Sequence, residues 1–412
     1  MIKTDKVTSL ALLIIVILAY SIMPIIPRIF SAYLTTYAYL GVVILTFFAI
    51  LIIGKQEFLL GIFPIIIPLV MLNVIIYFST RPEMMLWVYS LLLDVLAVAI
   101  GAYVIRFFDY KVIRVFVVVI LIFLAITAIT TIIGLNTNPD AARYLATVAE
   151  SNEEEAVRYG FMNIGGYEFV YTVGLIYPAI IYGYKSKKIH FAVLIAYAVI
   201  DFILIINSGY TISLLLFIAS TVFIFFKKEL TVRNVVVIFI VVLLFSLLLF
   251  SLLSYLIDSL ADVIDNKTIS DRLHDLAGGR EGLEKSEDNR LELYLTSITS
   301  FISHPIFGGI FNKVPTGGHS YILDMLANYG LFGLIAFIFI YSAIYKTFYK
   351  THKNKAGYGY VFWAFMQAII LSVLNTGLWL YVLTLFLPII LTYINQKGVK
   401  DESSLDSKFF TA

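Results

Sequence analysis

The stretch VIRVFVVVILIFLAITAITTIIG, residues 112–134, contains a single charged residue, Arg114. About 20 predominantly apolar residues are enough for a helix to cross the hydrocarbon core of a bilayer. The whole chain has the same character, because 61% of its 412 residues are hydrophobic and only 14% are charged. Its mean hydropathy is +0.95, whereas a soluble domain carries roughly a quarter charged residues. The sequence therefore predicts an integral membrane protein.

Apolar windows of this kind fill the chain almost end to end and leave no stretch that could form a separate water-soluble core. We therefore expect one all-α polytopic membrane domain, residues 1–412, with about twelve transmembrane helices. Lys3 and Lys6 precede the first window, and no small-residue cleavage pattern follows it, so we expect a retained span. The expected spans are 8–26, 32–53, 58–79, 84–105, 112–134, 166–184, 189–206, 210–226, 233–257, 329–347, 358–375 and 377–395.

The basic residues indicate how these spans are oriented. Cationic residues accumulate in cytoplasmic loops because they resist translocation. With both termini in the cytoplasm, most of the 29 lysines and arginines fall on the cytoplasmic side, and only Arg28 and Arg81 lie in short outer loops. The same orientation places two long loops outside, 135–165 and 258–328. Long loops without a core of their own are commonly functional or disordered, so we expect function in these two loops.

The larger outer loop is rich in charge but has a net negative charge between Asp258 and Glu292. A diffuse positive field therefore cannot recruit an anionic substrate, and any phosphate must be bound by individually positioned arginines. Arg280, which follows two glycines, and Arg290 are the best placed candidates in this loop. The alternative for most of these charges is a solvated segment without a specific role.

The end of the loop predicts two short helices. Apolar residues recur at helical spacing after Arg290 and face away from a polar side, so we expect an amphipathic helix at the membrane surface that Pro305 ends. A second short helix should start beside His319, which follows Gly317-Gly318, and should stop at Gly330. The apolar side of the first helix comprises Leu291, Tyr294, Leu295, Ile298, Phe301 and Ile302, and its polar side comprises Glu292, Thr296, Ser300 and Ser303.

The run from Arg290 to Gly333 resembles the signature region of the O-antigen polymerase and ligase family, the Wzy and WaaL type enzymes of bacterial surface glycan assembly. The similarity consists of an arginine before an amphipathic helix, a Pro-hydrophobic-Phe-Gly turn, a histidine before a short helix, and a final glycine step. These elements are Arg290, Pro305-Ile306-Phe307-Gly308, His319-Ser320-Tyr321 and Tyr329-Gly330-Leu331-Phe332-Gly333. They cover about a tenth of the chain, and the helix number extends the likeness loosely over the rest.

The sequence also departs from the family pattern. Ser320 stands where family members often have asparagine, and Gly308-Gly309 replaces a Gly-x-Gly turn. The serine-arginine pair often found at the outer end of an earlier helix corresponds here to Ser208-Gly209, so an arginine is missing. Arg280, or Arg158 in the other outer loop, could substitute for it.

The resemblance implies glycan transfer from a polyprenyl diphosphate carrier to a sugar hydroxyl of another lipid-linked glycan, outside the bacterial cytoplasmic (inner) membrane. It implies His319 and Arg290 as catalytic residues and Arg280, Arg158 and Tyr321 as substrate-binding residues. Paired arginines would stabilise the diphosphate leaving group without a metal, and a histidine can accept a proton near neutral pH. We expect no cofactor. The implied partners are the lipid-linked donor and acceptor, membrane lipid, and chain-length regulator and flippase proteins.

Three further observations limit the alternatives. The chain has no cysteine, which excludes disulfides, thiolate nucleophiles and Cys-based metal sites, and its basic residues follow the membrane spans, which gives no nucleic-acid signal. Asp94, Asp201 and Glu168 fall within or beside expected spans, where carboxylates are either paired internally or functional. Twelve helices with buried acids also fit a transporter or a flippase of lipid-linked sugars, and the motif is shared between polymerases and ligases. A rigid glycan-binding scaffold is a further alternative.

Overall fold

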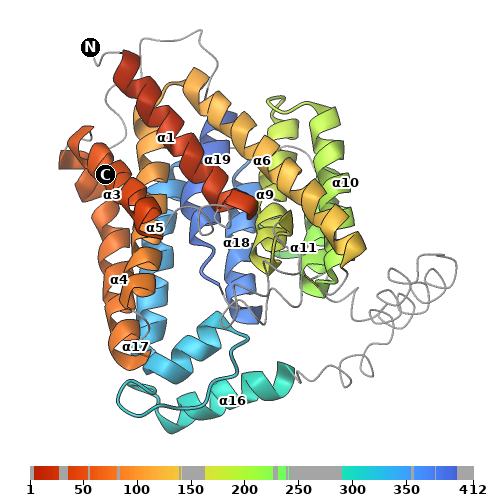
Figure 1. Cartoon of the computed structure of the whole chain (residues 1–412). Coiled ribbons are helices and arrows are strands. Elements are labelled where there is room, and N and C mark those ends of the chain that lie inside the picture. The colour runs from red at the N-terminus through yellow and green to blue at the C-terminus, as the bar shows by residue number, and fades with distance from the viewer. Residues whose placement is uncertain are drawn as a thin grey trace, which may run out of the picture.

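The computed structural model describes residues 4–26, 36–53, 56–80, 84–138, 163–225, 231–237, 290–353, 357–375 and 377–396, together with positions 141 and 240. Every regular element in these ranges is helical, and they contain no β-strand. Figure 1 shows the helices gathered into one bundle. The predicted all-α class is therefore confirmed.

Two groups of helices, separated by residues outside the described ranges, build the bundle. The first group comprises α1 Thr4–Ile22, α3 Thr36–Ile53, α4 Gln56–Thr80, α5 Met84–Phe107, α6 Tyr110–Thr137, α9 Tyr167–Lys185, α10 Phe191–Ser208 and α11 Thr211–Val222 with η2 Phe223–Phe225. The second comprises α16 Arg290–Ser303, α17 Tyr321–Ile344 with η3 Tyr345–Tyr349 and η4 Lys350–His352, α18 Tyr358–Leu374, and η5 Val382–Phe386 leading into α19 Leu387–Asn395.

Five stretches of helix in the described part of the chain are long and apolar enough to cross a membrane. Shorter apolar helices cover Ser9–Ile22, Ile212–Phe225, Tyr358–Leu374 and Val382–Asn395. The coarse prediction of a membrane protein is thus supported, whereas the number twelve stays a prediction, and the expected span 233–257 lies largely outside the described residues. The five candidate spans are Leu60–Phe78, Ser90–Phe107, Tyr110–Thr137, Phe191–Ser208 and Tyr321–His352.

The surface of these helices is apolar on the outside of the bundle. Phe78 on α4 is 72% exposed, Ile133 on α6 is 61% exposed, and Phe339 on α17 is 61% exposed. Such side chains would be unfavourable in water, but lipid tails are as apolar as the side chains themselves. The exposed apolar faces are therefore consistent with a lipid environment.

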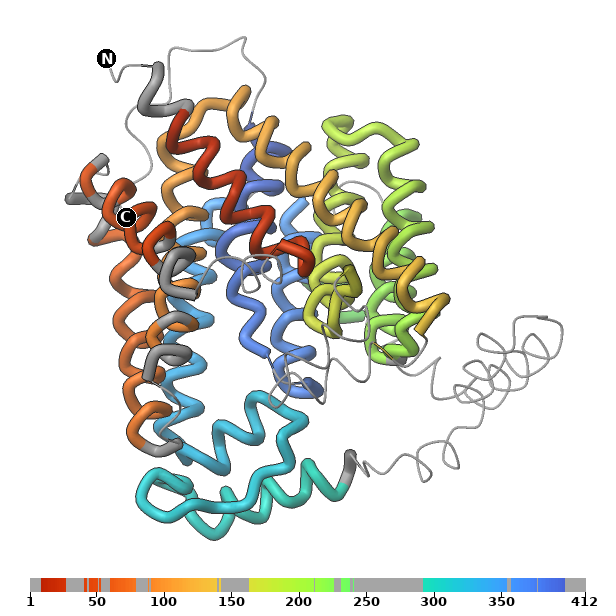
Figure 2. Tube along the Cα trace, viewed as in Figure 1, coloured from red at the N-terminus to blue at the C-terminus, as the bar shows by residue number. Residues whose placement is uncertain are grey.

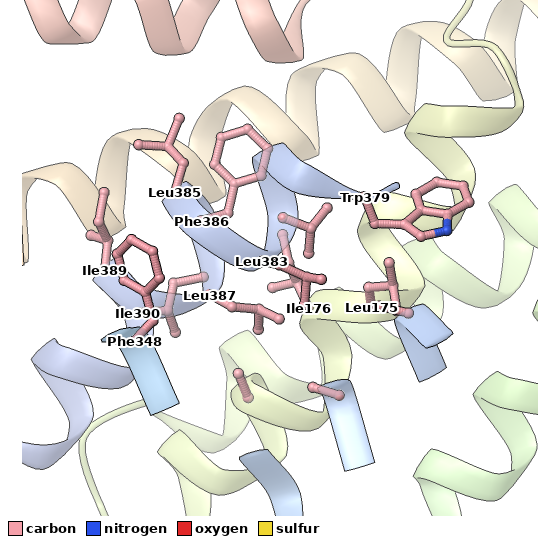
Figure 3. Close-up of a cluster of buried hydrophobic side chains, with 14 of the residues drawn as sticks. Leu175, Ile176, Phe348, Trp379, Leu383, Leu385, Phe386, Leu387, Ile389 and Ile390 are labelled. Carbon is pink, nitrogen blue, oxygen red and sulfur yellow. The ribbon is translucent and has the colours of Figure 1, made fainter. Parts of the chain in front are cut away.

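The core lies where α9, η5 and α19 meet (Figure 3). Leu175 and Ile176 on α9 pack with Leu383, Leu387 and neighbouring residues, and these four side chains are at most 1% exposed. α5 approaches this core so closely that a Cβ atom on Gly101 would overlap the Thr384 carbonyl. A rigid centre of this kind holds the ends of the surrounding helices in fixed positions.

Hydrogen bonds link residues at each of the two ends of the helix bundle. At one end, the Thr130 hydroxyl donates to the Asn163 carbonyl (3.0 Å) and the Asn375 amide donates to the Tyr171 hydroxyl (3.2 Å). At the other end, Lys188 donates to the Gln396 carbonyl (3.0 Å). The residues at the first end are those that the charge pattern places outside, and those at the second end are those it places in the cytoplasm.

Candidate active site at one end of the helix bundle

The helix that begins at Arg290, α16, lies at the end of the bundle opposite the start of α1 (Figures 1 and 2). Its range, Arg290–Ser303, agrees with the sequence prediction, since it begins at Arg290 and ends before Pro305. Tyr294 fastens it to the bundle because its hydroxyl donates to the Leu374 carbonyl at the end of α18 (2.9 Å). α16 therefore lies across the helix ends as part of the folded body.

The orientation of α16 differs in part from the expectation. Ser300, expected on the polar outer side, is buried, and its hydroxyl donates to the Pro315 carbonyl (2.7 Å). Leu295 and Ile302 on the apolar side are 49% and 69% exposed. The reason is that the segment following α16 folds back over the serine face and satisfies its hydroxyls. Leu295 and Ile302 are left uncovered on the apolar side, as expected for a helix at a membrane surface.

Two glycine motifs that are distant in sequence fit against each other in this region. Gly330 has φ +61° and ψ −148° and breaks α17 where the sequence predicted a stop. The Leu331 amide donates to the Pro305 carbonyl (2.9 Å), and the Gly309 amide donates to the Ala327 carbonyl (3.0 Å). Side chains at Gly308 or Gly330 would collide with the backbone of the opposite segment. The Pro305–Gly309 turn and the Gly330 break thus form one packed unit.

His319 lies in a turn that is held by hydrogen bonds on both sides. The Asp324 carboxyl accepts from the Gly318 amide (3.2 Å), the Ser320 amide (3.2 Å) and the Ser297 hydroxyl of α16 (2.6 Å). Hydrogen bonds to a charged group contribute roughly 1.5–3 kcal/mol each. His319 itself is half-buried. Its backbone is therefore fixed relative to α16 while part of its ring remains accessible.

Asp324 and Ser297 belong to the candidate site and were missed by the sequence analysis. The sequence signal for Asp324 was its place as an acidic residue in the first turn of α17. Ser320 caps this helix, and its hydroxyl accepts a hydrogen bond from the Leu323 amide (3.2 Å). For Ser297 no sequence signal was available, because its partners Gly317 and Asp324 belong to other elements.

Polar side chains of three helices lie within electrostatic range of one another beside this turn. The Asp94 carboxyl of α5 interacts electrostatically with the Glu168 carboxyl of α9 and with the Tyr321 hydroxyl of α17. The Tyr321 amide donates to the Asn375 carbonyl (3.0 Å), which links the group to the loop after α18. The structure thus places Tyr321, a predicted substrate-binding residue, with two of the three acids noted in the sequence.

Asp201 lies apart from this group. It is fully buried in α10, it interacts with Tyr177 and Tyr197, and neither carboxyl oxygen has a hydrogen-bond partner among the described residues.

The remaining predicted site residues have the following places. Arg290 is the first residue of α16, and its side chain is outside the described part of the structure. Arg280 and Arg158 lie outside the described residues altogether. Within the described ranges, no group of three or more His, Cys, Asp or Glu residues could hold a metal ion. Of the predicted site residues, the structure thus brings His319, Tyr321 and the start of α16 to one end of the bundle.

Comparisons with known proteins add no identification. No family model matches the chain, and no curated protein matches it. The family resemblance consequently rests on the motif between Arg290 and Gly333.

Proposed function

We propose that this protein is a glycosyltransferase that polymerises lipid-linked oligosaccharide repeat units at the outer face of the bacterial cytoplasmic membrane. The observation that carries the proposal is the position of His319. It is half-buried in a turn that Asp324 fixes to α16, next to the polar group around Tyr321. A proton acceptor, an arginine at the start of a surface helix and sugar-binding groups are the parts that glycan transfer needs.

The reaction can be written with these residues. The acceptor sugar hydroxyl attacks the anomeric carbon of the donor glycan and forms a new carbon–oxygen bond, while His319 accepts the hydroxyl proton. The bond between the anomeric carbon and the polyprenyl diphosphate breaks, and the diphosphate leaves with the electron pair. Arg290 pairs with the diphosphate oxygens, because a guanidinium binds two oxygens at once. No step requires a metal ion.

The position of Arg290 supports a ligand-binding role. A cation at the first position of a helix is unfavourable by about 0.3–1 kcal/mol, because the helix dipole is positive there. Free backbone amides at the same end favour an anion. A diphosphate at this end would therefore be held by the arginine and by the helix together.

The exposed apolar residues around α16 support a location at the membrane surface. Ile306 and Phe311 are 55% and 78% exposed, next to the uncovered side of α16. Apolar side chains of this kind enter the boundary between headgroups and acyl chains. The diphosphate of a carrier lipid lies at the same level, so α16 would meet the substrate where its lipid tail remains in the bilayer.

The proposal requires twelve spans with the Arg290–Gly333 region outside. We expect reporters fused near Lys187, Lys228 and Lys353 to be cytoplasmic and those near Ser151 and Glu284 to be extracytoplasmic. The reason is the charge bias of the loops, together with the division of the helix ends into two sets. Alkaline phosphatase and green fluorescent protein fusions measure this directly. An inverted pair would place the candidate site in the cytoplasm and remove the basis of the proposal.

Deletion of the gene tests the reaction itself. Without a polymerase, the surface glycan should be reduced to single repeat units, because export and attachment continue while elongation stops. Gel electrophoresis of the surface glycan measures the length distribution. Long polymer on lipid carriers but absent from the surface would indicate a ligase. Repeat units retained on the cytoplasmic side would indicate a flippase or another transporter.

A further inference from the structure

Beside the proposed catalytic residues, polar groups from four elements lie near one another. Asp94 interacts with both Glu168 and Tyr321, and the Tyr321 amide bonds the Asn375 carbonyl (3.0 Å). The Asn375 amide in turn donates to the Tyr171 hydroxyl (3.2 Å). Tyr171 lies three residues after Glu168 on α9, and side chains at this spacing are neighbours on a helix. We call Asp94, Glu168, Tyr171, Tyr321 and Asn375 the polar circuit.

The polar circuit has unused hydrogen-bonding capacity. Protein surrounds Glu168 on most sides, yet its side chain is exposed, so the carboxyl can be reached from outside the packed core. Its recorded hydrogen bond is a long one from the Tyr167 hydroxyl (3.4 Å). Neither Glu168 nor Asp94 has an ion-pair partner among the described residues, although an isolated carboxylate within a membrane protein is costly. The two carboxyls are therefore available to a ligand.

A second, independent observation next to the polar circuit also points to a ligand. Trp379 is more than nine-tenths buried, and its indole nitrogen has no hydrogen-bond partner in the described part of the chain. Its ring contacts Tyr171 edge-on, with centroids 5.5 Å apart. Figure 3 shows Trp379 at the edge of the apolar cluster, with its nitrogen at the edge of the ring. Buried indole donors usually find an acceptor.

The backbone of Trp379 is also strained. Its φ is +54°, a value that is rare for a large side chain. Such strain persists where the surroundings or a function require it. The strained residue lies in the loop that also supplies Asn375. The loop therefore fixes a donor and an aromatic ring at the rim of the polar circuit.

The chemistry of the polar circuit selects the ligand. The polar circuit and Trp379 present two carboxyls, two tyrosine hydroxyls, an amide and an indole N–H. These groups can form hydrogen bonds with the hydroxyl groups of a sugar. The two carboxyls offer no cationic partner to an anionic group, and any charge they carry repels it. A diphosphate is thus excluded from the polar circuit, whereas a neutral sugar or an amino sugar is accepted. Tyr210, which stacks on Tyr171 with centroids 5.5 Å apart, extends the aromatic wall beside it.

From these observations we infer that the polar circuit is a sugar-binding subsite that holds the acceptor glycan, separate from the diphosphate of the donor. This inference rests on the proposed function, which supplies the lipid-linked substrates. The carboxyl of Glu168 accepts a hydrogen bond from a sugar hydroxyl, and Trp379 donates one from its indole nitrogen.

Binding to the purified full-length protein in nanodiscs tests the inference with two probes. The first is the repeat-unit oligosaccharide released from its carrier by mild acid, and the second is polyprenyl diphosphate without sugar. We expect Glu168→Gln and Asp94→Asn each to weaken oligosaccharide binding by about tenfold or more, because each replaces a carboxyl acceptor oxygen with an amide donor. Polyprenyl diphosphate binding should be unchanged. Trp379→Phe, which keeps an aromatic ring, should also weaken the oligosaccharide selectively.

Asp201→Asn is the matched control, since Asp201 is a membrane-embedded carboxyl outside the polar circuit. It should leave binding of both probes unchanged. Unaltered oligosaccharide binding in Glu168→Gln and Asp94→Asn would overturn the subsite while the proposed function stands. A loss of polyprenyl diphosphate binding in these variants, or binding of Mg²⁺ alone that Glu168→Gln abolishes, would also overturn it. If the wild-type protein binds neither probe, the proposed function fails as well.

Discussion

Replacing Arg290 or His319 with alanine should reduce the surface glycan to single repeat units while the amount of protein in the membrane stays normal. Arg290 would no longer stabilise the negative charge that develops on the leaving diphosphate, and the loss of one such contact typically lowers a rate by about a hundredfold or more. His319→Ala removes the group that accepts the proton. The measurement is the length distribution of the glycan in cells that lack the native gene, together with an immunoblot of the membrane fraction.

Arg290→Lys tests whether the diphosphate needs the two parallel hydrogen bonds of a guanidinium or only a positive charge. A lysine keeps the positive charge but is a point donor that cannot bind two oxygens in the planar fork geometry of arginine. We therefore expect only partial recovery of chain length.

Two control substitutions are available at the same end of the bundle. His304 and Lys313 are both exposed near the end of α16. His304→Ala and Lys313→Ala should leave long chains intact, because these side chains take no part in the proposed reaction. Normal polymer from both Arg290→Ala and His319→Ala would refute the assignment and favour a transporter.

Replacing Gly330 with alanine should strongly reduce the amount of folded protein. Gly330 has φ +61° and ψ −148°, a region that is accessible essentially to glycine alone, and the strain is of the order of 1–3 kcal/mol. The added Cβ would lie 2.3 Å from the Ile306 carbonyl oxygen, and overpacking typically costs about 1–3 kcal/mol more. Fluorescence-detected size-exclusion chromatography after heating measures the loss.

Gly41→Ala is the matched control for this substitution. Gly41 lies inside α3, and a Cβ built on it meets no atom within 4 Å. Alanine is favoured over glycine in a helix by roughly 1 kcal/mol, so this variant should be as stable as the native protein or more stable. Equal stability of the Gly330→Ala variant would show that the Pro305–Gly309 turn can move away from α17, contrary to the packing described above.

Several elements could be predicted from sequence because their signals are local. Apolar windows marked the helices, as the agreement of 84–105 with α5 Met84–Phe107 illustrates. The amphipathic period after Arg290 and the proline at 305 set the limits of α16. Gly330 was recognised as a break since its lack of a side chain permits a backbone that other residues avoid.

The site was predictable only in part. His319 and Tyr321 were recognised from a motif, and the structure places them on either side of the N-cap Ser320. Asp324 was missed because its role depends on Gly318, Ser320 and Ser297 being brought within hydrogen-bond distance. The orientation of α16 was predicted incompletely, because the burial of Ser300 depends on where the later residue Pro315 returns.

By itself, the sequence determined that the chain is helical and apolar. It also determined where most helices lie and which turns need glycine. These features could be predicted because hydropathy, periodicity and backbone freedom are properties of neighbouring residues. Only the tertiary structure decided which distant residues meet. Asp94, Glu168 and Asp201 looked alike as acids in or beside apolar helices. The fold brings Asp94 of α5 within electrostatic range of Glu168 and Tyr321, whereas Asp201 is enclosed in α10 beside Tyr177 and Tyr197. Contacts between residues so far apart in the chain depend on how whole helices pack, and no local pattern encodes that arrangement.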